Sequence, residues 1–116
     1  MERVARDEFY ARFPRREPAT EMAGIAQGEL TIGKDTCISG IVEGDVFVPP
    51  GLQLIVDGIV EGSVHVEPGA TAYVHGTVEG DLNVHGAAFV DGEVKGIMRG
   101  DRSAVVHAST NGWVPA

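Results

Sequence analysis

The 116-residue sequence is poor in cysteine and in positive charge. Its single cysteine, Cys37, cannot form a disulfide within the chain, which fits a reducing compartment. Nine Lys and Arg residues stand against 17 Asp and Glu residues, so the formal net charge is -8. Nucleic acids and anionic membranes select basic surfaces, so we expect neither as a partner, whereas a basic protein is compatible with this charge.

Long apolar runs and aromatic residues are also scarce. No run approaches the ~20 residues of a membrane-spanning helix, and the start, MERVARDEFY, lacks the apolar core of a signal peptide. We therefore expect a cytoplasmic protein without membrane insertion. Aromatic residues make up 6% of the chain, which also holds 16 glycines. This composition predicts a thin, regular core of aliphatic side chains.

What the sequence does have is a repeat. The segments GIVEGDVFV, GIVEGSVHV and GTVEGDLNV begin at Gly40, Gly58 and Gly76. Extended to Gly24 and Gly92, the pattern gives coils of 16, 18, 18, 16 and 16 residues. The longer coils gain their extra residues at one place, VPPG and VEPG. A fixed period with insertions at one corner is typical of a solenoid.

Within each coil, apolar and polar residues alternate with the period of a β-strand. Alignment of the coils gives four inward columns of aliphatic residues: Ala26, Val42, Val60, Val78 and Val94; Leu30, Val46, Val64, Leu82 and Met98; Ile32, Val48, Val66 and Val84, broken at Gly100; and Ile38, Val56, Val74, Val90 and Val106. A second set of glycines marks the bends, where a Cβ would be crowded: Gly44, Gly62, Gly80 and Gly96. Five coils in one register argue against a small antiparallel sandwich. The sequence predicts an all-β, single-domain parallel β-helix of about five coils over residues 23–112.

The runs ELTIGKDTCISGIVEGDVFV and VDGIVEGSVHV resemble the glycine-flanked Val-x-Gly coils of the bactofilins, a family of polymer-forming bacterial cytoskeletal proteins. The resemblance covers roughly residues 28–100. It implies a right-handed β-helix that polymerises end to end without a nucleotide.

The two ends of the chain differ from the repeat. Residues 2–13, ERVARDEFYARF, are expected to form one amphipathic helix that ends at Pro14. Residues 1–22 would then be this helix and a linker, a candidate cap that docks on the open first coil or on a side of the solenoid. Residues 113–116 form a C-terminal tail, whose Trp113 could cover the other end.

One outward column repeats an acidic residue. Its members are Gln27, Glu43, Glu61, Glu79 and Lys95, and Asp45, Ser63 and Asp81 stand two residues further on. Aligned carboxylates repel one another. Glu43, Asp45, Glu61, Glu79 and Asp81, the acidic ladder, are therefore a candidate surface for a basic partner or a calcium ion. The alternative is an exposed stripe that only discourages aggregation.

Two further outward columns are candidates. The first, Ser39, Asp57, His75, Asp91 and His107, fits a divalent metal or, as we favour, ion pairs between coils, so no metal site is assigned. The second is Cys37, Ile55, Tyr73, Phe89 and Val105. Its members Ile55, Tyr73 and Phe89, the apolar stripe, are a candidate partner surface unless the N-terminal helix covers them. His65 and His85 are interpreted as isolated surface residues.

The sequence contains no recognisable catalytic arrangement. No nucleophile stands with a base, no glycine loop cradles a phosphate, and no zinc signature occurs. We therefore expect no enzymatic activity, no catalytic residues and no cofactor. Two functions remain. The first is a bactofilin-like structural protein that associates with itself end to end or side by side. The alternative is a small acidic binding module, such as an immunity protein that neutralises a cationic toxin.

Overall fold

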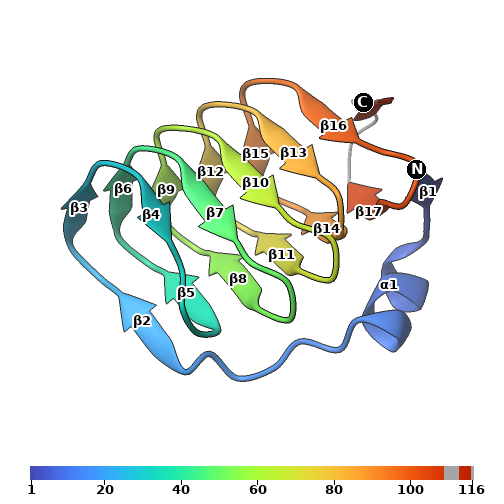
Figure 1. The fold of residues 1–116 in the computed structure, drawn as a ribbon, viewed down its shortest axis with the longest axis horizontal. Helices are drawn as coiled ribbons and strands as arrows, with labels where there is room; N and C mark the ends of the chain where they lie inside the picture. Colours follow the sequence, from blue (N-terminus) through green and yellow to red (C-terminus); the bar gives the residue numbers. More distant parts are fainter. Residues whose placement is uncertain (109–112, 116) are drawn as a thin grey trace.

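The computed structural model describes residues 1–108 and 113–115 and shows a solenoid of parallel strands (Figure 1). Each coil passes through three sheets, named A, B and C in chain order, and equivalent strands of successive coils pair in parallel. The predicted parallel β-helix of about five coils is confirmed.

The sheets have seven, five and six strands. Sheet A contains, in order, β1 (Glu2–Arg3), β17 (Val105–Ala108), β14 (Ala87–Val90), β11 (Thr71–Val74), β8 (Gln53–Val56), β5 (Thr36–Ile38) and β2 (Thr20–Met22). Sheet B contains β15 (Glu93–Val94), β12 (Thr77–Val78), β9 (Ile59–Val60), β6 (Ile41–Glu43) and β3 (Ile25–Gln27). Sheet C contains β18 (Trp113–Pro115), β16 (Met98–Gly100), β13 (Leu82–Val84), β10 (Val64–Val66), β7 (Val46–Val48) and β4 (Leu30–Thr31). Coils 1 to 5 are β2–β4, β5–β7, β8–β10, β11–β13 and β14–β16.

Aliphatic side chains stacked one above another form the core, as the sequence predicts. Val64 pairs with Val46 on one side and with Leu82 on the other, and all three are 0% exposed. The glycines at the bends between the strands of each coil let successive coils approach closely. A Cβ on Gly58 would overlap the carbonyl oxygen of Gly40, and one on Gly62 would overlap the main chain of Gly44. The recurring glycines are therefore required by packing between coils.

The corner after coil 5 is two residues longer than predicted. Val90 pairs with Ala108 and Ala88 pairs with Val106, so the expected pairing of Val90 with Val106 is wrong. The extra residues lie in the corner GDRSA, residues 100–104. Before this corner Val84 pairs with Gly100, 16 residues later, and after it Ala87 pairs with Val105, 18 residues later. As a result His107, and not Val105, follows Phe89 on the outer face of sheet A.

The N-terminal segment also differs from expectation. Residues 2–13 are not one helix: β1 pairs with β17, and only Arg6–Arg12 form α1. Main-chain bonds from Glu2 N to Ala104 O (2.7 Å) and from Val4 N to Val106 O (2.9 Å) draw the first residues into sheet A. Ala5, at the N-cap position, offers no side-chain cap to extend the helix.

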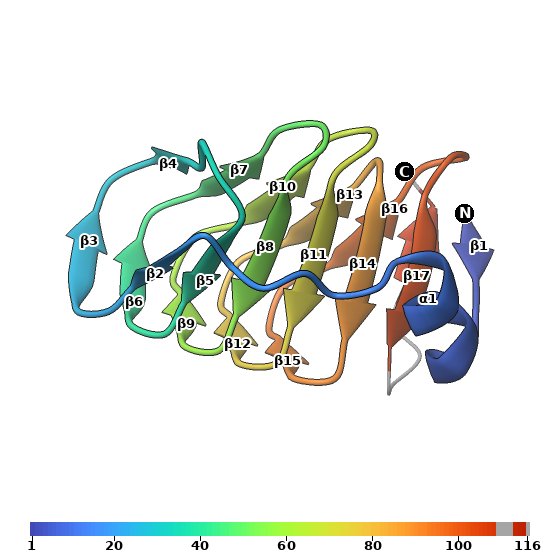
Figure 2. The same ribbon diagram turned by 90° about the horizontal axis from the view of Figure 1, so that it is seen from below.

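Residues 1–19, which we call the strap, run along the outside of sheet A from β17 to coil 1 (Figure 2). The strap leads into β2, which pairs with β5, so the solenoid begins at Thr20 rather than at residue 23. Two docking places were expected for the N-terminal segment, the open first coil and a side of the solenoid. In the structure it docks on a side, along sheet A (Figure 2). No helix in the described part of the chain is long and apolar enough to cross a membrane.

Both termini cover the last coil. Trp113 pairs with Met98 and is 7% exposed within the core. The Met1 side chain occupies the space that a side chain on Gly100 would fill, so Met1 closes the break in the third inward column. The Arg3 guanidinium donates to Trp113 O at 3.1 Å. At the opposite end, which we call the open end, β2, β3 and β4 are the last strands of their sheets.

Candidate interaction surfaces

The apolar stripe is buried beneath the strap. Ile55 is 1% exposed, and Tyr73 and Phe89 are both 0% exposed. The Phe9 ring of α1 lies 5.8 Å from the Tyr73 ring and 5.5 Å from the Phe89 ring, and Phe9 is itself fully buried. The expectation that Ile55, Tyr73 and Phe89 form an exposed partner surface is therefore wrong. The alternative, that the N-terminal helix covers the stripe, is confirmed at Tyr73 and Phe89, which both contact rings of α1.

Tyr73 also holds the strap through its hydroxyl group, which donates to the carbonyl oxygen of Phe13. The Tyr10 ring stacks on the Tyr73 ring with centroids 6.0 Å apart. Burial raises the pKa of Tyr73 to about 12, so the phenol remains a donor even at a pH where an exposed tyrosine ionises.

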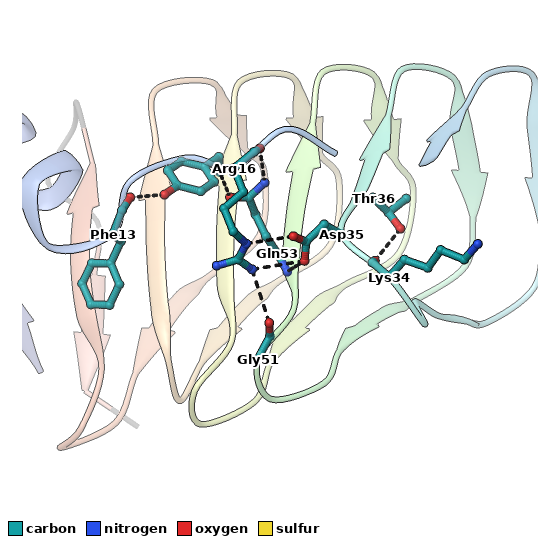
Figure 3. A network of polar contacts seen from close by, with 8 residues as sticks. Phe13, Arg16, Lys34, Asp35, Thr36, Gly51 and Gln53 are labelled. Atoms are coloured by element: carbon teal, nitrogen blue, oxygen red, sulfur yellow. Dashed lines mark hydrogen bonds and ion pairs between the residues drawn. The ribbon is translucent and has the colours of Figure 1, made fainter. Parts of the chain in front are cut away.

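A polar network fastens the strap to the corners that follow coils 1 and 2 and to β8 at the start of coil 3 (Figure 3). The Arg16 guanidinium donates to Asp35 at 2.8 and 3.1 Å and to Gly51 O at 3.3 Å. The hydrogen bond from Arg16 holds the pKa of Asp35 below its usual value, and a bond from Gln53 N at 2.9 Å adds to this effect. The Gln53 side chain, 1% exposed, bonds the Arg16 main chain. These contacts hold the strap against the solenoid at a defined position.

The glutamates of the acidic ladder point outward. Glu43, Glu61 and Glu79 are exposed, and bonds from Glu61 N to Val42 O and from Glu79 N to Val60 O, both 2.8 Å, keep them in register. None of the three takes part in an ion pair among the described residues. They remain a candidate surface for a basic partner.

An isoleucine ladder lies two residues before Gln27, Glu43 and Glu61, and the sequence pattern did not reveal it. Ile25, Ile41 and Ile59 pair across sheet B, and Ile25 is 66% exposed. The signal was present, because the residue before each inward valine of GIVEG is apolar although its position faces outward. Sheet B therefore presents an apolar row beside an acidic row.

The aspartates of the acidic ladder have a structural part. Asp45 Oδ1 accepts a bond from Ser63 N at 2.8 Å, Ser63 Oγ accepts one from Asp81 N at 3.0 Å, and Asp81 Oδ1 accepts one from Ile97 N at 2.9 Å. The bond from Ile97, helped by Arg99 at 3.2 Å, lowers the pKa of Asp81. Asp45 and Asp81 thus satisfy main-chain donors of the next coil.

The Asp/His column contains one hydrogen-bonded histidine and aspartate pair between coils, in place of the run of ion pairs that we favoured. His75 Nδ1 lies 2.6 Å from Asp91 Oδ1, and His75 Nε2 lies 2.8 Å from a guanidinium nitrogen of Arg15 in the strap. His107 falls outside this column because of the longer corner, and its Nδ1 donates to Val4 O at 2.9 Å. No group of three or more metal-ligating side chains occurs within residues 1–108 and 113–115.

His65 and His85 are not isolated, so that interpretation is wrong. The His65 ring stacks on Phe47 with centroids 4.6 Å apart. His85 Nδ1 lies 2.6 Å from Asp101 Oδ2, a bond that lowers the pKa of Asp101. The shifted register around residues 100–104 hid this second pair from the sequence pattern.

Pockets lie beside several corners of the solenoid. One, of about 470 Å³, lies between the strap and coils 3 to 5, with Arg12, Tyr73, His85 and Ser103 in its lining. The Ser103 hydroxyl lies 2.9 Å from Asp101 Oδ1 and 3.1 Å from the His85 carbonyl oxygen, so it is bonded to the aspartate and not to the imidazole. Another, of about 390 Å³, lies on the outer face of sheet C.

Comparisons with known proteins return no match: no family model fits the chain, and neither a curated protein nor a solved structure matches it. Function is therefore inferred from the geometry of these surfaces.

Proposed function

We propose that this chain is a non-enzymatic structural protein that associates with itself through the open end of the β-helix, as the resemblance to bactofilins implies. One observation carries the proposal. All three sheets finish at coil 1 with the edge strands β2, β3 and β4, and no described segment lies across them. Edge strands present unpaired main-chain donors and acceptors, which a second copy can pair.

The side chains at the open end support the same conclusion. Met22, Ala26 and Leu30 pack on the core but are only half-buried, and a hollow of about 250 Å³ runs beside Met22, Leu30 and Ile32. Contact between two open ends would remove this apolar surface from water at about 25 cal/mol per Å². An isologous contact of this kind closes a dimer.

Longer assemblies need a second contact at the other end. That end is covered by β1, β18, Met1 and Trp113, and its edge includes Pro115, which has no N–H to donate. We therefore propose the dimer as the basic unit and filaments as a further step through β1, β15 and β18.

Light scattering at rising concentration tests the proposal. We expect the mass of the full chain to rise from one copy to two, while Leu30→Lys, which places a charge at the open end, stays monomeric. Val114→Lys is the matched control, because Val114 is 44% exposed at the opposite end, and this variant should still dimerise. A full-length chain that stays monomeric at high concentration would contradict the proposal.

A second candidate function rests on sheet B. The exposed glutamates Glu43, Glu61 and Glu79 form a row without paired cations beside the partly exposed isoleucine ladder. Such a face suits a basic, amphipathic protein, as expected of an immunity protein that neutralises a cationic toxin. A toxin gene immediately upstream would favour this function. Its product should then bind the wild type more tightly than Glu61→Gln, with a difference that shrinks as salt is added.

A further inference from the structure

The pocket of about 390 Å³ on the outer face of sheet C is lined by Glu29, Thr31, Phe47, Pro49, Pro50 and Glu67. Its walls come from the first three coils. The corner of coil 1 is two residues shorter than that of coil 2, since Thr31 pairs with Phe47 whereas Thr36 pairs with Leu54. The two prolines belong to the longer corner, which turns at Gly51 with φ +82°. They give the pocket an apolar wall.

One face of the Phe47 ring is available in this pocket. The other face stacks on His65, with centroids 4.6 Å apart and an angle of 10° between the rings. Strand pairing places His65 on one side of Phe47 and Thr31 on the other. Thr31 is small and exposed, so it leaves the ring face on its side open to the pocket. An aromatic face carries negative electrostatic potential and attracts cations.

Two carboxylates complete the lining. Glu29 and Glu67 take part in no ion pair among the described residues. Two carboxylates are too few to hold a bare metal ion, and an aromatic ring and two prolines are not metal ligands. An organic cation fits better, because its charge is spread over a group that also makes apolar contacts.

We propose that this pocket binds a guanidinium or alkylammonium group, with the cation over the open face of Phe47 and within reach of Glu29 and Glu67. An arginine or lysine side chain of a protein supplies this chemistry, and so does a free small cation. The site uses side chains on the outer face of sheet C, and it needs neither main-chain pairing by β4 nor the acidic ladder.

Nuclear magnetic resonance titration of the full chain tests the site. The probes are methylguanidinium, tetramethylammonium, a Gly-Arg-Gly peptide with blocked ends, and the same peptide with citrulline in place of arginine. We expect shifts centred on Phe47, His65 and Thr31 with the cationic probes and none with the neutral citrulline peptide. Tighter binding of the arginine peptide than of methylguanidinium would identify a protein side chain as the source. Equal binding would identify a small cation.

Substitutions in the pocket show whether it is the place where the cationic probes bind. Phe47→Leu and Glu67→Gln should each weaken binding about two- to fivefold. Glu61→Gln is the matched control, because it removes the same charge on sheet B and should leave binding unchanged. If Phe47→Leu does not fold, Glu67→Gln decides. An absence of localised shifts, equal shifts with the citrulline peptide, or equal effects of Glu61→Gln and Glu67→Gln would overturn the proposal.

Discussion

The side-chain amide of Gln53 pairs with the main chain of Arg16 in both directions. Arg16 N donates to Gln53 Oε1 at 2.7 Å, and Gln53 Nε2 donates to Arg16 O at 2.8 Å. A side chain in sheet A therefore takes the place of a neighbouring strand for one residue of the strap. Because Gln53 is 1% exposed, loss of either bond would leave a polar atom of its side-chain amide buried without a partner.

Gln53→Met tests this pairing at nearly constant volume. The substitution leaves Arg16 N and O without partners, so we expect a loss of about 1–3 kcal/mol in the free energy of unfolding. Urea denaturation measures the loss. Gln27→Met changes the exposed glutamine of sheet B and should have little effect. Equal stability of the two variants would show that the pairing contributes nothing.

Val64→Asp tests the register of the core. Val64 lies between Val46 and Leu82, so an aspartate there would be buried without a partner. That penalty of several kcal/mol is a large share of a domain's ~5–15 kcal/mol, and we expect the protein to unfold. His65→Asp, at the adjacent outward position, should stay folded. Circular dichroism distinguishes the two, and a folded Val64→Asp would refute the register.

Glu61→Gln and Asp81→Asn remove the same charge with opposite expected results. Glu61 is exposed in a row of like charges, so its loss should leave stability unchanged or raise it by about a few tenths of a kcal/mol. Asp81 accepts bonds from Ile97 N and Arg99, so its loss should lower the melting temperature. Thermal melts measure both changes in stability. A clearly lower melting temperature for Glu61→Gln would mean that the Glu61 carboxylate is paired in the folded protein.

Acid should loosen the strap at Arg16. The bond from Arg16 lowers the pKa of Asp35 in the folded protein, so this contribution is present above the unfolded pKa of about 3.9 and is lost as pH falls through the folded pKa. The protection of the Arg16 guanidinium against hydrogen exchange, relative to the intrinsic rate at each pH, should therefore fall only below the unfolded pKa of about 3.9. In Asp35→Asn the exchange should already be fast at neutral pH. A wild-type profile unchanged by acid would contradict the assignment.

Cys37 should be a poor nucleophile. Burial, reinforced by the hydrogen bond to Asp57, raises the pKa of its thiol to about 11. At pH 8 we expect iodoacetamide to react at least about a hundredfold more slowly than with a free cysteine of pKa about 8.5. Mass spectrometry over time measures the rate. The rate should rise in a denatured control, and a rapid reaction in the folded state would place Cys37 at the surface.

The local period of the sequence was enough to predict the inward columns, because each valine is placed by its neighbours within one coil. Val64 and the outward Glu61 follow from that period alone. The corner at residues 100–104 was missed because it carries no proline to mark the insertion, and the error moved Val105, Val106 and His107. The pairing of β1 with β17 joins residues about a hundred positions apart, and no local pattern reveals it.

The surfaces were harder to predict than the core. Whether an outward residue is free depends on what crosses it, and the strap turned the stripe of Ile55, Tyr73 and Phe89 into a second core. Asp81 and Glu79 look alike in the sequence, yet only Asp81 reaches a main-chain donor of the next coil. The different roles of two such residues depend on which atoms lie beside each of them in the folded protein. Composition and spacing do not specify these contacts.

The strap has a consequence for how the molecule unfolds. In most solenoids each coil touches only its neighbours, so the ends fray independently and unfolding spreads along one dimension. Here one segment contacts the corner after coil 1 through Arg16 and Asp35, and it contacts β17 at the other end of sheet A through Glu2 and Val105. Loosening either end releases the segment that holds the other. The two ends should therefore melt together, in a single transition whose closing contacts are among the most distant in the sequence and the slowest to form.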